Sequence, residues 1–302
     1  MATAGGSGRA TCGCTFIGEV ALGRAVALAA RTFTSTFHAS LLQQFRTYTL
    51  SGWTITSILS PVFLFAGAWV VLRFLGQGSS PPVFFELTGY PSYLAFVVLG
   101  VAFNGLAMSA LEDGGNAVYE EESNGTWDVL ALAPFPRFPW IFAKTLAGLL
   151  TAFIDFFAVL VLGVFFFEFA PTPQGLLVAL AGIVLTLAAL QGVGFLMAAL
   201  GLVWKQPFAI AFILSPVIVL LSGMMFPIGI LPAWLQPFSN LIPLTHGLTI
   251  VRDAILLDRG FIDLLPVFIR LIISGGVLMA VGFWSFRAME TKARELGVLG
   301  RY

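Results

Sequence analysis

The sequence predicts an all-α membrane protein with six transmembrane helices, an N-terminal amphipathic interfacial helix and an outer re-entrant helical segment between spans five and six. Three observations support this fold class. Of the 302 residues, 58% are hydrophobic and only 10% are charged, whereas a soluble domain carries about a quarter charged residues. Six apolar stretches are long enough to cross a bilayer core, which takes about 20 residues each. One further apolar stretch is interrupted by regularly spaced prolines.

The first residues predict a flexible leader over 1–16, because they are small and polar with no apolar run that would mark a signal peptide. The only two cysteines, Cys12 and Cys14, lie in this leader. A Cys-x-Cys pair without a nearby His or third Cys is a weak metal signal. We therefore expect two free thiols and no metal site.

The region 17–50 predicts a cytoplasmic amphipathic helix. Large apolar residues recur every three or four positions and polar residues fill the gaps, which gives one apolar stripe on a helix. With Arg24 and Arg31 nearby, such a helix suits the inner membrane interface. The alternative is a short soluble helix packed on its own domain. The stripe consists of Phe33, Phe37, Leu41, Phe45 and Tyr48.

The membrane domain is predicted over 51–290, followed by a cytoplasmic tail over 291–302. Pro61 and Pro216 fall inside predicted spans, where neighbouring helices can satisfy the carbonyls that a proline frees. The six predicted spans run over about 54–72, 92–111, 141–167, 175–203, 208–226 and 265–286.

The distribution of Lys and Arg predicts that both termini are cytoplasmic, because cytoplasmic flanks carry the excess of these residues. In that orientation eleven lie on the inner side and three on the outer side. The inner residues are Arg9, Arg24, Arg31, Arg46, Arg137, Lys144, Lys205, Arg287, Lys292, Arg294 and Arg301, and the outer ones are Arg73, Arg252 and Arg259.

An acidic segment, Glu112–Pro139, follows the second span and is predicted to be irregular and cytoplasmic. It carries six acids against the single base Arg137. Thr126 can cap a short helix that two prolines end, and this helix would expose Trp127 and Leu130 to water. An exposed apolar element in an acidic frame indicates docking to another protein, and the alternative is that it folds back onto the membrane surface. The acids are Glu112, Asp113, Glu120, Glu121, Glu122 and Asp128.

A second irregular segment, Met224–Gly247, is predicted on the outer side. Its prolines recur every five or six residues, so no straight spanning helix survives, yet it is too apolar for an open loop. Two short helices dipping into the outer leaflet fit both facts, with Trp234 as an interface anchor. The prolines are Pro227, Pro232, Pro237 and Pro243.

At these two segments the sequence resembles the permease subunit of the type-2 ATP-binding-cassette exporters, such as the daunorubicin-resistance and nodulation lipo-oligosaccharide types. The loop "EEESNGTWDVLALAPFP" matches the family order of acids, Gly-Thr and a short coupling helix. The outer match consists of Ser222-Gly223, Phe226-Pro227, Leu231 to Leu235 and Pro243 to His246.

The resemblance implies a division of labour between subunits. The chain would be a permease and not itself an enzyme, with two copies of a separate ATPase subunit holding ATP and Mg, and with a second permease copy as homodimer or heterodimer. It would lie in the inner membrane among lipids, with no cofactor of its own and no role for nucleic acid. The implied coupling loop is Glu120, Glu121, Glu122, Gly125, Thr126, Trp127 and Leu130, and the implied outer gate is Phe226, Pro227, Trp234, Pro243 and His246.

The residues agree independently that ATP is not bound here, because no GxxxxGK[ST] phosphate loop surrounds any lysine. The stretch "ISGGV" at 273–277 resembles an ATPase signature loop, but inside a span it is better interpreted as small residues for close helix packing. No catalytic set that would make the chain a hydrolase gathers on one side of the membrane. His246 is expected to be a hydrogen-bonded structural residue.

Polar residues inside the predicted spans are candidate functional groups, because charge there is costly. Asp155 supports an alternative function, an ion-coupled secondary transporter or channel. Arg270 is expected to meet Asp155 or Glu168, or to extend to water. Helix-to-helix hydrogen bonds and substrate contacts both remain open for the amides. The set is Asn104, Asp155, Gln191 and Arg270.

Overall fold

The structure is a computed structural model that describes residues 11–47, 70, 82–126, 136–167, 172–202, 204 and 207–295. This described part is helical. Its elements are α1 (Thr11–Thr47), α4 (Pro82–Thr88), α5 (Tyr93–Ser123), α7 (Arg137–Phe167), α8 (Pro173–Gly201), α9 (Pro207–Leu221), the 3₁₀ turn η2 (Ile228–Ile230), α10 (Gln236–Leu241), α11 (Pro243–Leu256) and α12 (Phe261–Glu295).

Four described helices, α5, α7, α8 and α12, are long and apolar enough to cross a membrane. They correspond to the second, third, fourth and sixth predicted spans. The fifth is shorter than predicted, because α9 has 15 residues and ends at Leu221, a length of about 22 Å against a hydrocarbon core of about 30 Å. The first predicted span, 54–72, lies outside the described residues except for Val70.

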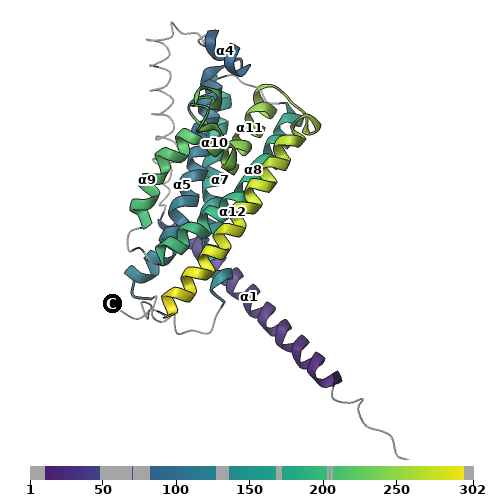
Figure 1. Ribbon diagram of the computed structural model, residues 1–302, viewed down its shortest axis with the longest axis vertical. Coiled ribbons are helices and arrows are strands. Elements are labelled where there is room, and N and C mark those ends of the chain that lie inside the picture. Colours follow the sequence, from purple (N-terminus) through teal and green to yellow (C-terminus); the bar gives the residue numbers. More distant parts are fainter. Residues whose placement is uncertain are drawn as a thin grey trace, which may run out of the picture.

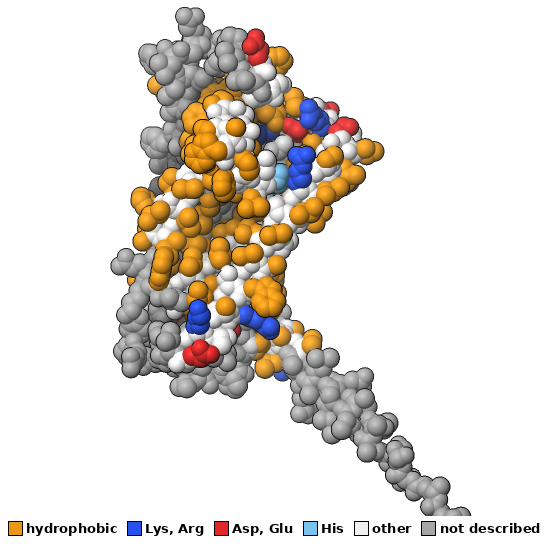
Figure 2. All heavy atoms as spheres, in the orientation of Figure 1, with side chains coloured by type: hydrophobic (Ala, Val, Ile, Leu, Met, Phe, Trp, Pro, Cys, Tyr) orange, Lys and Arg blue, Asp and Glu red, His pale blue; other side chains and the backbone are white. Residues whose placement is uncertain are grey.

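The helices form an elongated bundle with two distinct ends (Figure 1). One end carries α4, α10 and α11 and is called the α11 end. The other end carries α1 and the last turns of α12 and is called the α1 end. In the orientation predicted from Lys and Arg, the α1 end is cytoplasmic. Figure 2 shows charged side chains gathered at the two ends, with a hydrophobic face between them.

The core of the bundle lies where α5 packs against α7 and α8. Leu99, Phe103 and Leu106 on α5 are fully buried. The Phe103 ring meets the ring of Phe156 on α7 edge to face, at a centroid distance of 5.4 Å, a favourable aromatic geometry. These contacts join α5 to α7 in the core of the bundle.

Helices α8 and α12 approach closely because glycines face each other. A Cβ at Gly282 would lie 2.3 Å from the carbonyl oxygen of Gly192, and a Cβ at Gly192 would lie 2.6 Å from the amide nitrogen of Met279. Close packing through small residues is common between membrane helices. Gly275 in the "ISGGV" stretch likewise packs on Ala189, where an added Cβ would lie 2.6 Å from the alanine Cβ. The interpretation of that stretch as a packing element is therefore supported.

The prediction that the acidic segment is irregular from Glu112 onward was wrong for its first half. Helix α5 continues without a break to Ser123, so Glu112, Asp113 and the acids 120–122 lie on a helix. Gly114 and Gly115 lie within this helix. A Cβ at Gly114 would lie 2.2 Å from the carbonyl oxygen of Gly194, so tertiary packing explains this glycine better than local flexibility.

Helix α1 begins at Thr11, inside the region predicted as a flexible leader. It packs against α7. On the predicted stripe, the Phe33 ring lies 5.7 Å from that of Phe37 and 5.8 Å from that of Phe142 on α7, whereas Phe45 is exposed. The stripe is thus used in part for contact with the bundle, and Tyr48 lies outside the described residues.

The 224–247 segment is a succession of short elements. A turn follows α9, with Gly223 at φ +72°, a conformation that favours glycine. The segment continues through η2 and α10 into α11, whose first residue is Pro243. A proline lies at or next to the start of each of these short helices. Proline suits this place because the backbone N–H groups of a first turn have no partner within the helix. Helix α11 is buried along nearly its whole length, against α8, α12 and α5.

Candidate functional site

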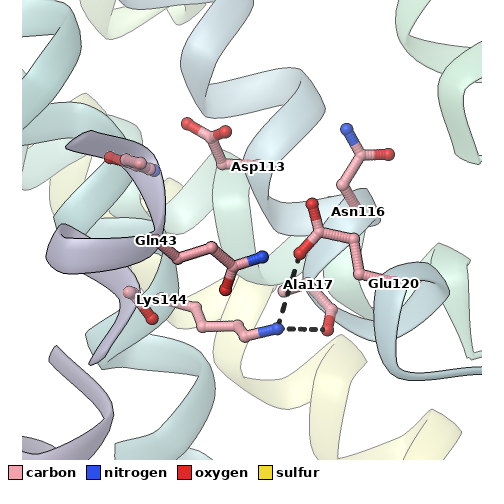
Figure 3. Close-up of a pocket in the computed structure, with 8 residues that line it drawn as sticks. Gln43, Asp113, Asn116, Ala117, Glu120 and Lys144 are labelled. Carbon is pink, nitrogen blue, oxygen red and sulfur yellow. Dashed lines mark hydrogen bonds and ion pairs between the residues drawn. The ribbon is translucent and has the colours of Figure 1, made fainter. Parts of the chain in front are cut away.

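A polar pocket of about 190 Å³ opens at the α1 end between α1, α5 and α7. Figure 3 shows α1 on one side of it and the end of α5 on the other. The pocket is lined by Ser40, Gln43, Gln44, Asp113, Asn116, Ala117, Glu120 and Lys144. The amphipathic helix and the acidic segment, which were predicted as separate features, therefore line one pocket.

Lys144 on α7 is the cation of this pocket. Its Nζ lies 3.7 Å from the Glu120 carboxylate and donates to the Ala117 carbonyl oxygen at 3.3 Å (Figure 3). The same Nζ lies 2.7 Å from the Glu121 carboxylate. It also lies 5.1 Å from the centroid of the Trp140 ring. Two acids of the implied coupling loop are therefore directed, at least in part, at a lysine of the same chain.

Asp113 is the acid that reaches deepest into the pocket wall. Its carboxylate accepts a hydrogen bond from Ser109 one turn earlier. Gly148 on α7 makes room for it, since a Cβ there would lie 1.9 Å from the nearer carboxylate oxygen. Neither Asp113 nor Lys144 was identified as a site residue from the sequence.

The chain leaves α5 through a turn that Glu121 holds. Gly125 has φ +69°, and the Thr126 hydroxyl donates to the Glu121 carboxylate at 2.5 Å. Glu121 therefore joins Thr126 to Lys144. Of the other predicted coupling residues, Trp127 and Leu130 lie outside the described residues, as does the side chain of Glu122.

A comparison with protein-family models identifies the chain's relatives. The model of the ABC-2 type transporter matches residues 31–256, from α1 to the end of α11. The chain belongs to the ABC-2 type transporter family.

Curated relatives match over a shorter stretch. The protein named "Probable multidrug ABC transporter permease YbhR" of Escherichia coli strain K12 is 27% identical over 144 residues, which is 48% of this chain and 39% of that protein. Its counterpart in Escherichia coli O157:H7 matches with the same figures. The matched stretch thus spans well under half the length of these relatives. With its apolar helices, this ABC-2 family member is a multi-pass membrane protein.

At the α11 end, the predicted outer-gate residues separate into exposed and buried ones. Phe226 and Trp234 are exposed, at 52% and 68%. Pro227 precedes η2. Pro243 and His246 are buried on α11, and the His246 Nε2 lies 2.8 Å from the Asn240 carbonyl oxygen. The histidine contact agrees with the structural role expected for it.

The most elaborate polar arrangement at this end centres on Arg252 of α11, which the sequence analysis counted only as an outer-side charge. Its Nη1 donates to the Gly223 carbonyl oxygen at 2.8 Å. Its Nη2 donates to the carbonyl oxygens of Met224 at 2.7 Å and Phe96 at 2.9 Å. The guanidinium carbon lies 3.3 Å from the centroid of the Phe96 ring, a cation–π contact. One buried side chain thus touches α5, α11 and the turn after α9.

The neighbouring Asp253 adds a second tie at the same end. Its carboxylate accepts from the Tyr90 hydroxyl at 2.5 Å and pairs with Arg259 at 3.0 Å. Burial, and then the nearby Asp253 charge, raise the pKa of the Tyr90 phenol. The phenol therefore stays protonated and donates a hydrogen bond to Asp253 throughout the physiological pH range.

The four intramembrane polar residues lie on four different helices. Gln191 on α8 is buried and accepts from the Thr145 hydroxyl of α7 at 2.7 Å, a helix-to-helix hydrogen bond. The Asn104 Oδ1 is buried without a partner in the described part of the chain. Asp155 is half-buried on α7, and Arg270 is exposed on α12.

An apolar groove of about 330 Å³ lies between α5, α8, α9 and α12, beneath α10 and the start of α11. Figure 2 shows the hydrophobic face of the molecule on which α9 and α12 lie. The groove is lined entirely by hydrophobic side chains, among them Leu111, Met197, Ile218, Phe238 and Leu278. Its chemistry suits an apolar group.

The missed residues left a signal in the sequence. Arg252 and Asp253 interrupt the apolar run of "LTIVRDAIL", and a charged pair within an apolar run is unusual. Lys144 lies within the predicted span 141–167, where a charge is costly, but it was counted only as a cytoplasmic charge.

Proposed function

We propose that this chain is the transmembrane subunit of an ATP-driven exporter that moves an amphipathic, lipid-linked or drug-like substrate outward. Two copies of a separate ATPase subunit would supply ATP and Mg, and a second permease copy would complete the pathway in the inner membrane, with both termini cytoplasmic. Membership of the ABC-2 family supports this function. The printed name of the Escherichia coli relative, a multidrug permease, and the wholly apolar groove favour a substrate with an apolar part.

The observation that carries the proposal is the anchored exit from α5. Glu121 is fixed by Lys144 at 2.7 Å, and Thr126 is fixed by Glu121 at 2.5 Å. The chain therefore enters the segment 127–135 from a point that is rigidly tied to α5 and α7. A force on that segment reaches two membrane helices, as a coupling loop requires.

This geometry assigns different roles to the predicted coupling residues. Glu121 holds the loop rather than facing a partner, since its carboxylate serves Lys144 and Thr126. Glu120 is exposed over 48% of its side chain and remains available for a partner. Trp127 and Leu130 stay the predicted apolar contacts with the ATPase.

The test is co-purification of the permease with a co-expressed ABC ATPase subunit from the same organism. Trp127→Ala with Leu130→Ala should remove the ATPase from the purified complex while the permease yield stays unchanged. Trp204→Ala is the matched control, because Trp204 is exposed just after α8 at the same end of the bundle. Full retention of the ATPase by the double variant would refute the docking assignment. Glu121 is left intact, because its replacement would also break the pocket.

The alternative function, an ion-coupled transporter or channel, depends on Asp155, a half-buried acid on a spanning helix. Asp155→Asn separates the two functions. Export driven by ATP should continue in proteoliposomes without an ion gradient, whereas ion-coupled export should stop. Transport that follows an imposed proton gradient and disappears in this variant would favour the alternative.

A further inference from the structure

Three segments of the α11 end meet at the buried guanidinium of Arg252. They are the first turns of α5, which offer the Phe96 carbonyl oxygen, the turn after α9, which offers those of Gly223 and Met224, and α11 itself. Arg252 is only 5% exposed. Burying a charge is costly unless hydrogen bonds compensate for the lost water, so this arrangement depends on all three segments staying together.

The acceptors that Arg252 uses are all main-chain oxygens. A carbonyl oxygen can be withdrawn by movement of the backbone alone, without breaking a pair of opposite charges. The Nε of Arg252 is buried without an acceptor in the described part of the chain, so even the assembled state leaves one donor unsatisfied. The hydrogen bonds of Arg252 can therefore hold the three segments together and still be broken by a movement of the backbone.

The turn after α9 is held against α5 with no space to spare. A Cβ at Gly100 on α5 would lie 2.1 Å from the Met224 carbonyl oxygen and 2.9 Å from the Arg252 Nη2. The missing side chain of Gly100 therefore leaves the space that the turn occupies against α5. Arg252 holds the turn there by its hydrogen bonds to Gly223, Met224 and Phe96, and this set of bonds is called the clamp. Ser222 and Met224, the residues around Gly223, are each 1% exposed.

We propose that Arg252 is the positioning residue that keeps the outer end closed, and that release of the turn 222–224 from α5 is the step that opens it. The α9 helix ends in this turn, and the 224–247 segment begins in it. Separation of the turn from α5 therefore moves α9 together with η2 and α10, the short helices that follow the turn. The role of an exit gate rests on the proposed function, whereas the clamp itself rests on the geometry alone.

The experiment measures access to the turn from outside. Ser222→Cys places a thiol of similar size at the buried position, in a background with Cys12→Ser and Cys14→Ser. Proteoliposomes containing the permease are treated with a membrane-impermeant maleimide. Both Arg252→Gln and Gly100→Ala should raise the labelling rate about tenfold or more, because loss of even one hydrogen bond to a charged group shifts an equilibrium by about that factor.

Matched controls separate opening from general loosening. Arg259→Gln removes a charge from the same end but leaves the clamp intact, because Arg259 is 53% exposed and pairs with Asp253. Gly105→Ala adds the same methyl group to α5 where no atom lies within 4 Å. Both should label at the unsubstituted rate. Equal labelling of Arg252→Gln, Gly100→Ala and the two controls would overturn the proposal.

A second measurement keeps Arg252 and Gly100 unchanged, so that its result does not depend on whether their variants fold. In the complete exporter with its ATPase, labelling of Ser222→Cys should rise when ATP is added. Constant labelling in a complex that hydrolyses ATP and transports would also overturn the proposal. If the permease alone behaves as expected but no ATPase associates, the clamp stands and the proposed function fails.

Discussion

The contact between Lys144 and Glu121 should be among the strongest polar interactions at the α1 end. Removing the lysine charge should cost more stability than removing the glutamate charge. The two side chains are only 11% and 20% exposed, and their charged atoms lie 2.7 Å apart. Lys144→Met removes the cation and leaves Glu121 beside Glu120 without a compensating charge. Glu121→Gln keeps an oxygen that accepts from Lys144, and Glu120, at 3.7 Å, still balances its charge.

These differences set the expected magnitudes. A hydrogen bond to a charged group contributes about 1.5–3 kcal/mol, and removing one partner of a buried ion pair costs about 3–5 kcal/mol. Because the pair is not fully buried, we expect Lys144→Met to lower the free energy of unfolding by about 2–3 kcal/mol. Glu121→Gln should lower it by about 1 kcal/mol. The double variant should lose less than the sum of the two, by about 1 kcal/mol.

The assay is reversible unfolding of the purified permease in mixed detergent and SDS, followed by tryptophan fluorescence. Lys292→Met serves as the control, because Lys292 is exposed on α12 and its loss should change stability by less than about 0.5 kcal/mol. Equal costs for Lys144→Met and Glu121→Gln would refute the reasoning. So would single-variant costs that add to within about 0.5 kcal/mol, the behaviour of independent sites.

Two further predictions use the same assay. Gly282→Ala should destabilise the bundle by about 1–3 kcal/mol through overpacking, because the new methyl group would lie 2.3 Å from a carbonyl oxygen of α8, whereas Gly276→Ala, on the open side of α12, should be neutral; comparable effects would contradict the close α8–α12 contact. Tyr90→Phe should cost about 1.5–3 kcal/mol by removing the hydrogen bond to Asp253, which is 7% exposed, and Tyr119→Phe at an exposed position should cost nothing measurable.

Apolar helices were the best predicted part of the fold, because membrane burial depends on local composition. The span predicted over 141–167 matches α7, Arg137–Phe167, and the span over 175–203 matches α8, Pro173–Gly201. Helix ends were less accurate where acids were taken as the start of an irregular segment. Helix α5 continues through Glu112 to Ser123, and the missing side chain of Gly114 lets it meet α8.

The candidate sites could be predicted only in part, because their charges are explained by partners far away in the sequence. Lys144 is 23 residues from Glu121, and Arg252 is 156 residues from Phe96. Counts of charge in the flanks assigned Lys144 to the inner side and Arg252 to the outer side, and these residues lie at opposite ends of the bundle. The charge counts could not show that Lys144 lines a pocket or that Arg252 lies buried among carbonyl oxygens.

Helix α5 links the two polar arrangements. Its first turns supply the Phe96 carbonyl oxygen to Arg252, and its last turns supply Glu121 to Lys144. With 31 residues it is about 46 Å long, and its buried core residues bind it to α7 and α8 between these points. A tilt of α5 imposed at the α1 end would therefore move Phe96 relative to Gly223 and Met224, unless the turn after α9 moved with it. Because hydrogen bonds weaken steeply with distance and angle, a small tilt is sufficient to release the guanidinium. In the proposed exporter, movement of the coupling segment and opening of the outer end would thus be two consequences of one helix motion.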